Sequence, residues 1–187
     1  MITKQTKFIL AVALQAVIIL AIIIFKLSIL DGGTDILLKI EPIDPRDMLR
    51  GDYVTFQYDI SNIVSYYANG QQIRNGDTVY VILRQSGKYW MAQAIQKKQP
   101  TESELFIKGK VESGGLEDQI NSSLPALHHI NGSSSFHIVY GVEQYFIPEG
   151  KGGNFNFRNK EAVAQIVVDD NGNAVLKHIY IDGKLWP

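Results

Sequence analysis

An uninterrupted apolar run near the N-terminus constrains this chain of 187 residues more than any other feature. The run extends from Phe8 to Phe25, contains no charged residue, and has Gln15 as its only strongly polar residue. As an α-helix it would be roughly 27 Å long, which is close to the roughly 30 Å hydrocarbon core of a bilayer. The sequence therefore predicts one transmembrane anchor, to which we assign residues 8–30.

The charges on either side of the run predict how the chain is oriented. Lys4 and Lys7 precede the run, whereas Asp31 is the first acidic residue of the chain. Positive charge before a first span favours a cytoplasmic N-terminus, and Lys26 after the run weakens this bias. We expect residues 1–7 to be a cytoplasmic tail, residues 31–187 an extracytoplasmic domain, and the protein a single-pass component of the cell membrane.

Two other interpretations of the run are less compatible with the sequence. A cleaved secretory signal has an apolar core of about 7–15 residues and small residues before the cleavage site, but here bulky residues fill the places where small ones belong. A helix buried in a globular protein would need a core that surrounds it on every side. A retained anchor therefore remains the favoured interpretation.

The composition of residues 31–187 limits the possible partners and chemistry. This part carries 15 basic and 19 acidic residues, a net charge of −4, which argues against nucleic acid or an anionic lipid surface as the main partner. The chain has no cysteine, which excludes disulfides, thiolate metal sites and thiol catalysis.

Strand and turn patterns dominate the sequence after the anchor. Short runs rich in β-branched and aromatic residues alternate with glycine turns, and the clearest hairpin is predicted at 162–168 and 174–181. A flexible exit at 31–34, a short helix at 60–68 and a long loop at 114–135 are also expected. Further strands are predicted at 35–41, 53–58, 78–84, 89–95, 105–111 and 136–140. The sequence thus predicts a mainly β fold, an antiparallel sandwich or barrel with one or two short helices, after one N-terminal transmembrane helix.

The densest group of charges precedes the second predicted strand. Two arginines alternate with three acids and end at a glycine turn, so the segment is either a rigid, self-capping turn or an acidic binding site. Its candidate residues are Asp44, Pro45, Arg46, Asp47, Arg50, Gly51, Asp52 and Tyr53, followed by Tyr58 within the strand.

A second motif lies in the C-terminal half. Glu143 sits among apolar residues there, and we predict that it pairs with Arg46 or Arg50 and so brings the two motifs together. The candidate residues of this second motif are Tyr140, Gly141, Glu143, Tyr145, Pro148, Glu149 and Gly150.

These two motifs resemble the GDYXXLXY family of membrane-anchored bacterial proteins. Gly51, Asp52, Tyr53 and Tyr58 match the signature, and Phe56 stands where the family has Leu. The resemblance covers roughly residues 36–183 and the anchor, with 114–135 as extra length. It implies an anchored extracytoplasmic domain, often encoded beside multi-spanning membrane proteins, and it supplies no catalytic residues.

A weaker resemblance, over 45–56, is to the start of the type I signal peptidase fold. Those enzymes use a serine just before the turn and a lysine on a following strand. Here Asp44 precedes Pro45, and no lysine lies between Gly51 and Gln85. A relative of that fold would therefore be catalytically inactive.

The sequence offers little for metal or cofactor binding. His128 and His129 are adjacent in the predicted loop, while His137 and His178 fall in separate strands, so no convergent metal site and no cofactor is expected. We expect an accessory or interaction module whose partner is another envelope protein, in particular an integral membrane protein. The alternatives are an envelope hydrolase that uses Asp44, Asp47, Asp52 and Glu143, and a structural spacer.

Overall fold

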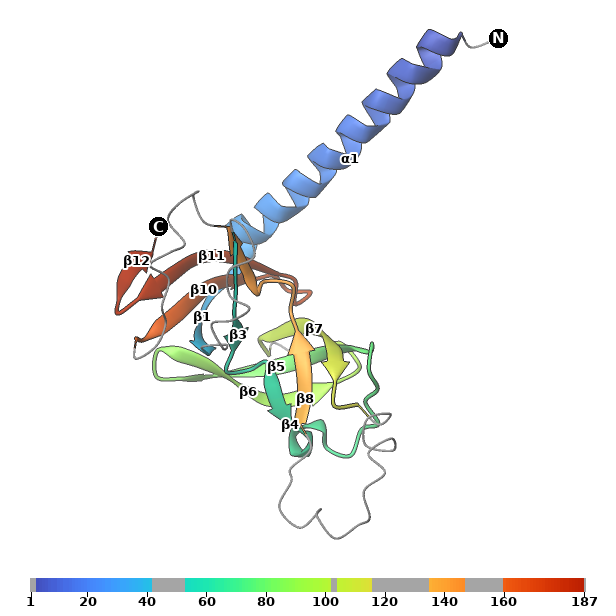
Figure 1. Ribbon diagram of the computed structural model, residues 1–187. Coiled ribbons are helices and arrows are strands. Elements are labelled where there is room, and N and C mark those ends of the chain that lie inside the picture. Colours follow the sequence, from blue (N-terminus) through green and yellow to red (C-terminus); the bar gives the residue numbers. More distant parts are fainter. Residues whose placement is uncertain (1–2, 42–52, 102–103, 116–134, 147–159, 187) are drawn as a thin grey trace.

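A computed structural model of the chain describes residues 3–41, 53–101, 104–115, 135–146 and 160–186. One long helix, α1 (Lys4–Gly32), projects from a domain built of β-strands (Figure 1). The antiparallel, mainly β fold after an N-terminal apolar helix agrees with the fold class predicted from the sequence.

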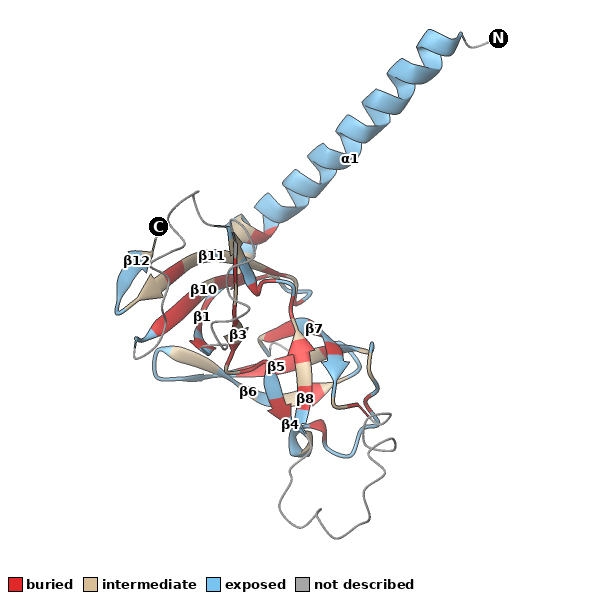
Figure 2. Cartoon of the chain, viewed as in Figure 1, coloured by how far each residue is buried: buried red, intermediate tan, exposed pale blue. Residues whose placement is uncertain are grey.

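Helix α1 presents almost its whole surface to the outside. Every residue of the apolar run is exposed, and Ile29 is the only helix residue that is buried in the domain (Figure 2). The helix is long and apolar enough to cross a membrane. The alternative of a core helix in a globular protein is therefore wrong, because nothing in the described part of the chain surrounds α1.

The exit from the helix is not the flexible segment that the sequence predicted. The helix runs through Gly32, and strand β1 (Thr34–Glu41) starts after the single residue Gly33. The Gly33 N–H donates to the Ile29 carbonyl at 2.9 Å, and a Cβ on Gly33 would lie 2.6 Å from Val167 Cγ1 and 2.8 Å from the Val168 carbonyl oxygen. We call this close contact of Gly33 with Ile29, Val167 and Val168 the helix joint. Glycine is needed there for space, since its backbone is ordinary extended chain.

Among the described residues, the strands form two five-stranded sheets and one two-stranded sheet, and all of these strand pairs are antiparallel. The first sheet has the order β12-β11-β10-β1-β3, the second β4-β8-β7-β5-β6, and the small one is β2-β9. Their bounds are β2 (Tyr53–Thr55), β3 (Gln57–Tyr58), β4 (Asn62–Val64), β5 (Thr78–Ser86), β6 (Tyr89–Gln96), β7 (Phe106–Ser113), β8 (Ser135–Val139), β9 (Gln144–Phe146), β10 (Ala162–Val168), β11 (Ala174–Ile181) and β12 (Lys184–Trp186).

The two large sheets enclose one apolar core and together form a nearly closed, barrel-like structure. Strand β1 of the first sheet lies next to β6 of the second, and the Lys108 N–H of β7 donates to the Gly172 carbonyl in the β10–β11 turn at 2.8 Å. Alternation explains the burial: Ile36, Leu38 and Ile40 point inward from β1 while their neighbours point outward. Figure 2 shows buried stretches on strands of both large sheets.

Most strand predictions are confirmed within one or two residues. The hairpin β10–β11 has the predicted bounds, and its turn forms where Asp169 accepts the backbone N–H groups of Asn171 and Asn173. The strands predicted at 78–84 and 89–95 are confirmed as the paired strands β5 and β6, whereas β12 was not anticipated. Of the predicted 114–135 loop, residues 116–134 lie outside the described part, and Ser135 already starts β8.

Two predictions between residues 53 and 68 are wrong. The helix expected at 60–68 is instead β4 followed by a short 3-10 helix, η1 (Ser65–Ala68), because Ile63 is needed in the core and pairs with Phe136 of β8. The single strand expected at 53–58 divides at Phe56 into β2 and β3, which join different sheets.

Candidate functional site

The two sequence motifs meet in the structure, as the sequence predicted. Strand β2 from the first motif pairs with β9 from the second, with Tyr53 opposite Phe146, Val54 opposite Tyr145 and Thr55 opposite Gln144. The ladder is extended by one bond, since the Phe56 N–H donates to the Glu143 carbonyl at 3.0 Å. This pairing places Tyr58 beside the Tyr140–Glu143 turn.

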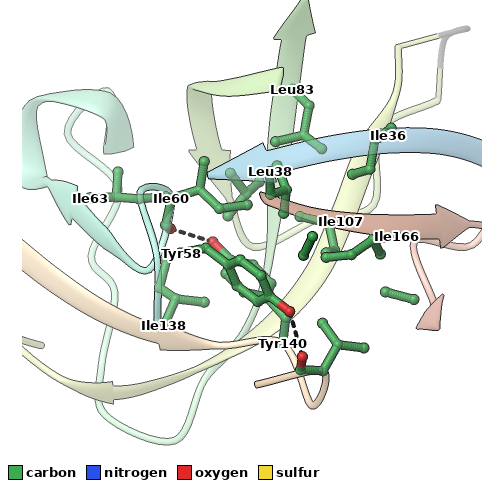
Figure 3. Close-up of a cluster of buried hydrophobic side chains, with 14 of the residues drawn as sticks. Ile36, Leu38, Tyr58, Ile60, Ile63, Leu83, Ile107, Ile138, Tyr140 and Ile166 are labelled. Atoms are coloured by element: carbon green, nitrogen blue, oxygen red, sulfur yellow. Dashed lines mark hydrogen bonds between the residues drawn. The ribbon is translucent and has the colours of Figure 1, made fainter. Parts of the chain in front are cut away.

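Two tyrosines bring polar groups into the apolar core. Tyr58 and Tyr140 lie among aliphatic side chains from both large sheets (Figure 3). The Tyr58 hydroxyl donates to the Val142 carbonyl, and the Tyr140 hydroxyl donates to the Ile60 carbonyl at 2.6 Å. Tyr58 therefore ties the first motif to the backbone of the second, and Tyr140 ties the second motif to the backbone just after the first. We call these contacts together with the β2–β9 pair the motif junction.

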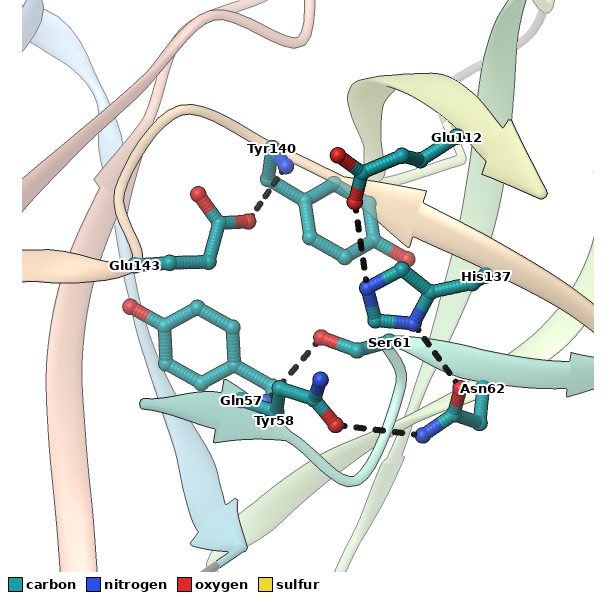
Figure 4. A network of polar contacts seen from close by, with 8 residues as sticks. All are labelled: Gln57, Tyr58, Ser61, Asn62, Glu112, His137, Tyr140 and Glu143. Carbon is teal, nitrogen blue, oxygen red and sulfur yellow. Dashed lines mark hydrogen bonds and ion pairs between the residues drawn. The ribbon is translucent and has the colours of Figure 1, made fainter. Parts of the chain in front are cut away.

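Glu143 closes the turn on which the motif junction is built. Its carboxylate accepts the Tyr140 backbone N–H, and only 9 % of the residue is exposed (Figure 4). Gly141 between them has φ +79°, a left-handed conformation that favours glycine. The predicted partners Arg46 and Arg50 lie outside the described residues, so the ion pair proposed for Glu143 stays a prediction.

Burial governs the protonation of the two tyrosines. Burial, and then the nearby charge of Glu143, raises the pKa of Tyr58 well above its usual value. The same two causes, with a further contribution from Asp59, raise the pKa of Tyr140. Both phenols consequently stay protonated and act as hydrogen-bond donors, which suits a structural role better than general-base chemistry.

Asp59 is a candidate functional residue that sequence reasoning missed. Burial, followed by the charge of Glu41, raises the pKa of the Asp59 carboxyl to about 6. Its Oδ1 atom is buried and accepts no hydrogen bond from the described residues. The one signal in the sequence was its position between Tyr58 and Ile60, two residues that the fold buries.

A chain of polar side chains crosses from β3 to β7 near the motif junction. His137 Nδ1 lies 2.9 Å from Asn62 Oδ1, its Nε2 lies 3.5 Å from Glu112, and the Asn62 amide reaches Gln57 at 3.4 Å (Figure 4). No group of three or more potential metal ligands occurs among the described residues. His178 is far along the other sheet beside Tyr180, and His128 and His129 are not described.

The remaining candidate residues divide into two groups. Tyr145 is half-buried on β9, with its ring 5.6 Å from that of Trp186 on β12. The structure does not describe Asp44, Pro45, Arg46, Asp47, Arg50, Gly51, Asp52, Pro148, Glu149 and Gly150. The described motif residues connect strands of the domain, through the β2–β9 pair and the hydrogen bonds of the buried tyrosines.

Comparison with known proteins agrees with the resemblance carried by these motifs. The model of the family described as "GDYXXLXY protein" matches residues 15–179, from within α1 to the last strands of the domain. Searches of curated proteins and of solved structures found no match. The match includes both halves of the motif junction, and the chain therefore belongs to the GDYXXLXY family.

Proposed function

We propose that this protein is a single-pass membrane protein whose β domain lies outside the cytoplasm and serves as an accessory module for an integral membrane partner. The observation that carries the proposal is the helix joint. With Gly33 as the only residue between helix and strand, a domain anchored by α1 is held directly at the membrane surface. A rigid support of this kind suits a domain that contacts a membrane-embedded partner from one side.

The surface of α1 supports the same proposal. Its apolar side chains are exposed on all sides, and an apolar helix of this kind requires lipid or other helices around it. Gln15 is also exposed within the run and offers a hydrogen bond to a neighbouring helix, worth about 0.6–2 kcal/mol.

Pull-down from native membranes tests the partnership. The tagged full-length protein is extracted in mild detergent beside a variant in which 8–25 is replaced by an unrelated apolar span and the helix joint is kept. We expect a stoichiometric integral membrane protein with the natural span and less of it with the replacement. Recovery of both proteins without a partner would contradict the proposal.

The natural absence of cysteine provides a test of orientation. Each introduced cysteine is unique in the chain, so Thr6→Cys reports on the N-terminal end of α1 and Lys98→Cys on an exposed position of the β domain. A membrane-impermeant maleimide should label Lys98→Cys in intact cells and Thr6→Cys only after permeabilisation. The reverse pattern would place the domain in the cytoplasm.

A carboxylate-dependent hydrolase is the second candidate function, and Asp59 is the observation that favours it. A partly buried acid with a pKa near neutrality is a common property of catalytic acids and bases. Among the other acids considered, Glu143 is occupied by the Tyr140 N–H, which removes it as a free catalytic group. Hydrolysis of envelope substrates that is lost in Asp59→Asn while partner binding persists would favour this candidate.

A further inference from the structure

A groove lies where the end of α1 faces the second large sheet. It has a volume of about 710 Å³ and is open to the outside. Helix residues Phe25 and Lys26 form one wall, and Lys108 and Lys110 of β7 form the other. We call this the basic groove.

The positive charge of the basic groove comes from separate parts of the chain. Lys108 and Lys110 alternate with the inward-facing Gly109, so both project from the outer face of β7, and Lys26 approaches from the helix. None of the three lysines has an ion-pair partner among the described residues. Glu112 also lines the groove, so among the described residues the lining holds three ammonium groups and one carboxylate. The lining therefore carries an excess of unpaired ammonium groups.

The position of the groove identifies the ligand chemistry. Lys26 immediately follows the apolar run, at the depth where hydrocarbon gives way to headgroups if α1 spans a bilayer. The helix joint fixes the height of β7 relative to Lys26, because Gly33 leaves no room for a flexible linker. An apolar ring at Phe25 next to three ammonium groups matches the boundary between acyl chain and phosphate.

We propose that the basic groove binds the phosphate of an anionic phospholipid headgroup in the leaflet next to the domain. This inference rests on the membrane anchoring in the proposed function but not on the presence of a protein partner. Lysine ammonium groups bind phosphate as point charges. The net charge of −4 for residues 31–187 does not reveal this site, because it includes acidic residues that lie elsewhere in the domain.

Lipid selectivity of the full-length protein tests the proposal. The protein is placed in nanodiscs of mixed phosphatidylglycerol and phosphatidylcholine, and the lipids that remain bound after detergent extraction are counted by native mass spectrometry. The double variant Lys108→Gln/Lys110→Gln is compared with Lys98→Gln/Lys160→Gln, which removes the same charge from two exposed lysines outside the groove. Thermal unfolding of all forms checks that the domain stays folded.

We expect the natural protein and the Lys98/Lys160 variant to retain phosphatidylglycerol preferentially. The Lys108/Lys110 variant should lose at least about fivefold of this preference, given the contribution of each basic residue near an anionic surface. Equal retention of phosphatidylglycerol by the two variants would overturn the proposal. An equal rise in the thermal unfolding temperature with inorganic phosphate in place of the lipid would also overturn it. Resistance to carbonate extraction is measured in parallel: a protein that integrates but shows no preference refutes only this inference, whereas one that does not integrate refutes the anchoring as well.

Discussion

Helix α1 and the β domain distribute polar and apolar groups in opposite ways. The apolar run of the helix places its isoleucines, leucines and phenylalanines on the outside. The domain instead buries the hydroxyls of Tyr58 and Tyr140 and the carboxylate of Glu143. A helix satisfies its own backbone, so its side chains are free to match an apolar surrounding. The short strands of the motif junction leave backbone carbonyls in the core, and buried side-chain donors are needed to satisfy them.

Truncation of an apolar side chain should have very different effects in the two regions. Phe56→Ala in the core should cost about 3–5 kcal/mol of unfolding free energy, because it leaves a cavity at a fully buried site. Ile18→Ala on the exposed helix surface should leave the unfolding of the domain unchanged. Both tryptophans, Trp90 and Trp186, lie in the domain, so their fluorescence during denaturation in micelles reports on it alone. Similar losses for both variants would mean that α1 packs into the domain.

At the boundary between the two regions, substitution of one glycine should lower the stability of the domain, whereas substitution of its neighbour should not. Gly33→Ala places a Cβ against Val167 and two carbonyl oxygens and should cost about 2–3 kcal/mol. Gly32→Ala meets nothing within 4 Å and should be neutral, or stabilising by up to about 1 kcal/mol, because alanine is the better helix former. Thermal unfolding of the two variants measures the difference. Equal stability would show that the helix joint is loose.

The buried hydroxyls of the motif junction should contribute more than an exposed one. Tyr140→Phe leaves the Ile60 carbonyl without its donor and should cost about 1–2 kcal/mol, and Tyr58→Phe should have a similar effect at Val142. Tyr66→Phe, at a side chain that is 84 % exposed, serves as the matched control and should have no measurable effect. Chemical denaturation distinguishes the three, and a neutral Tyr140→Phe would reduce the junction to a packing contact.

Asp59 should make the domain less stable as the pH rises from about 4 to about 6. Its folded-state pKa of about 6 lies above the ordinary value of 3.8, so the folded protein binds more protons in this interval than the unfolded chain. The carboxyl is partly exposed, and the loss should therefore be about 1 kcal/mol rather than the full value of the shift. Denaturation of the natural protein and of Asp59→Asn across this range checks the sign. An unchanged pH dependence in Asp59→Asn would exclude Asp59 as its source.

Much of the architecture could be predicted from local patterns. The apolar run predicted α1, alternation at 35–41 predicted β1, and an apolar run rich in β-branched residues at 162–168 predicted β10, with nearly correct ends for the strands. Two errors were made at 53–68. The regular alternating segment at 53–58 is divided at Phe56, and Ile63 forms a strand because it pairs with Phe136, more than 70 residues away. Non-local pairing overrides local propensity in such short segments.

The candidate site was predicted only in outline. The approach of the two motifs was expected from Glu143 and is confirmed by the β2–β9 pair, but the contacts that join them were not foreseen. Backbone carbonyls are the observed partners of the two buried tyrosines. No side-chain pattern reveals which carbonyl will lack a strand partner, so the roles of Tyr58, Tyr140 and Asp59 required the fold.

The sequence by itself determined that the chain combines one membrane-compatible helix with an antiparallel β domain and that it resembles the GDYXXLXY family. Hydrophobic length and period-two alternation are local properties, and they are readable without coordinates. Only the tertiary structure decided that the helix meets the domain without a linker, that the motifs share one buried junction, and that three lysines line one groove. Each of these depends on distances between residues remote in sequence, which packing and strand register fix.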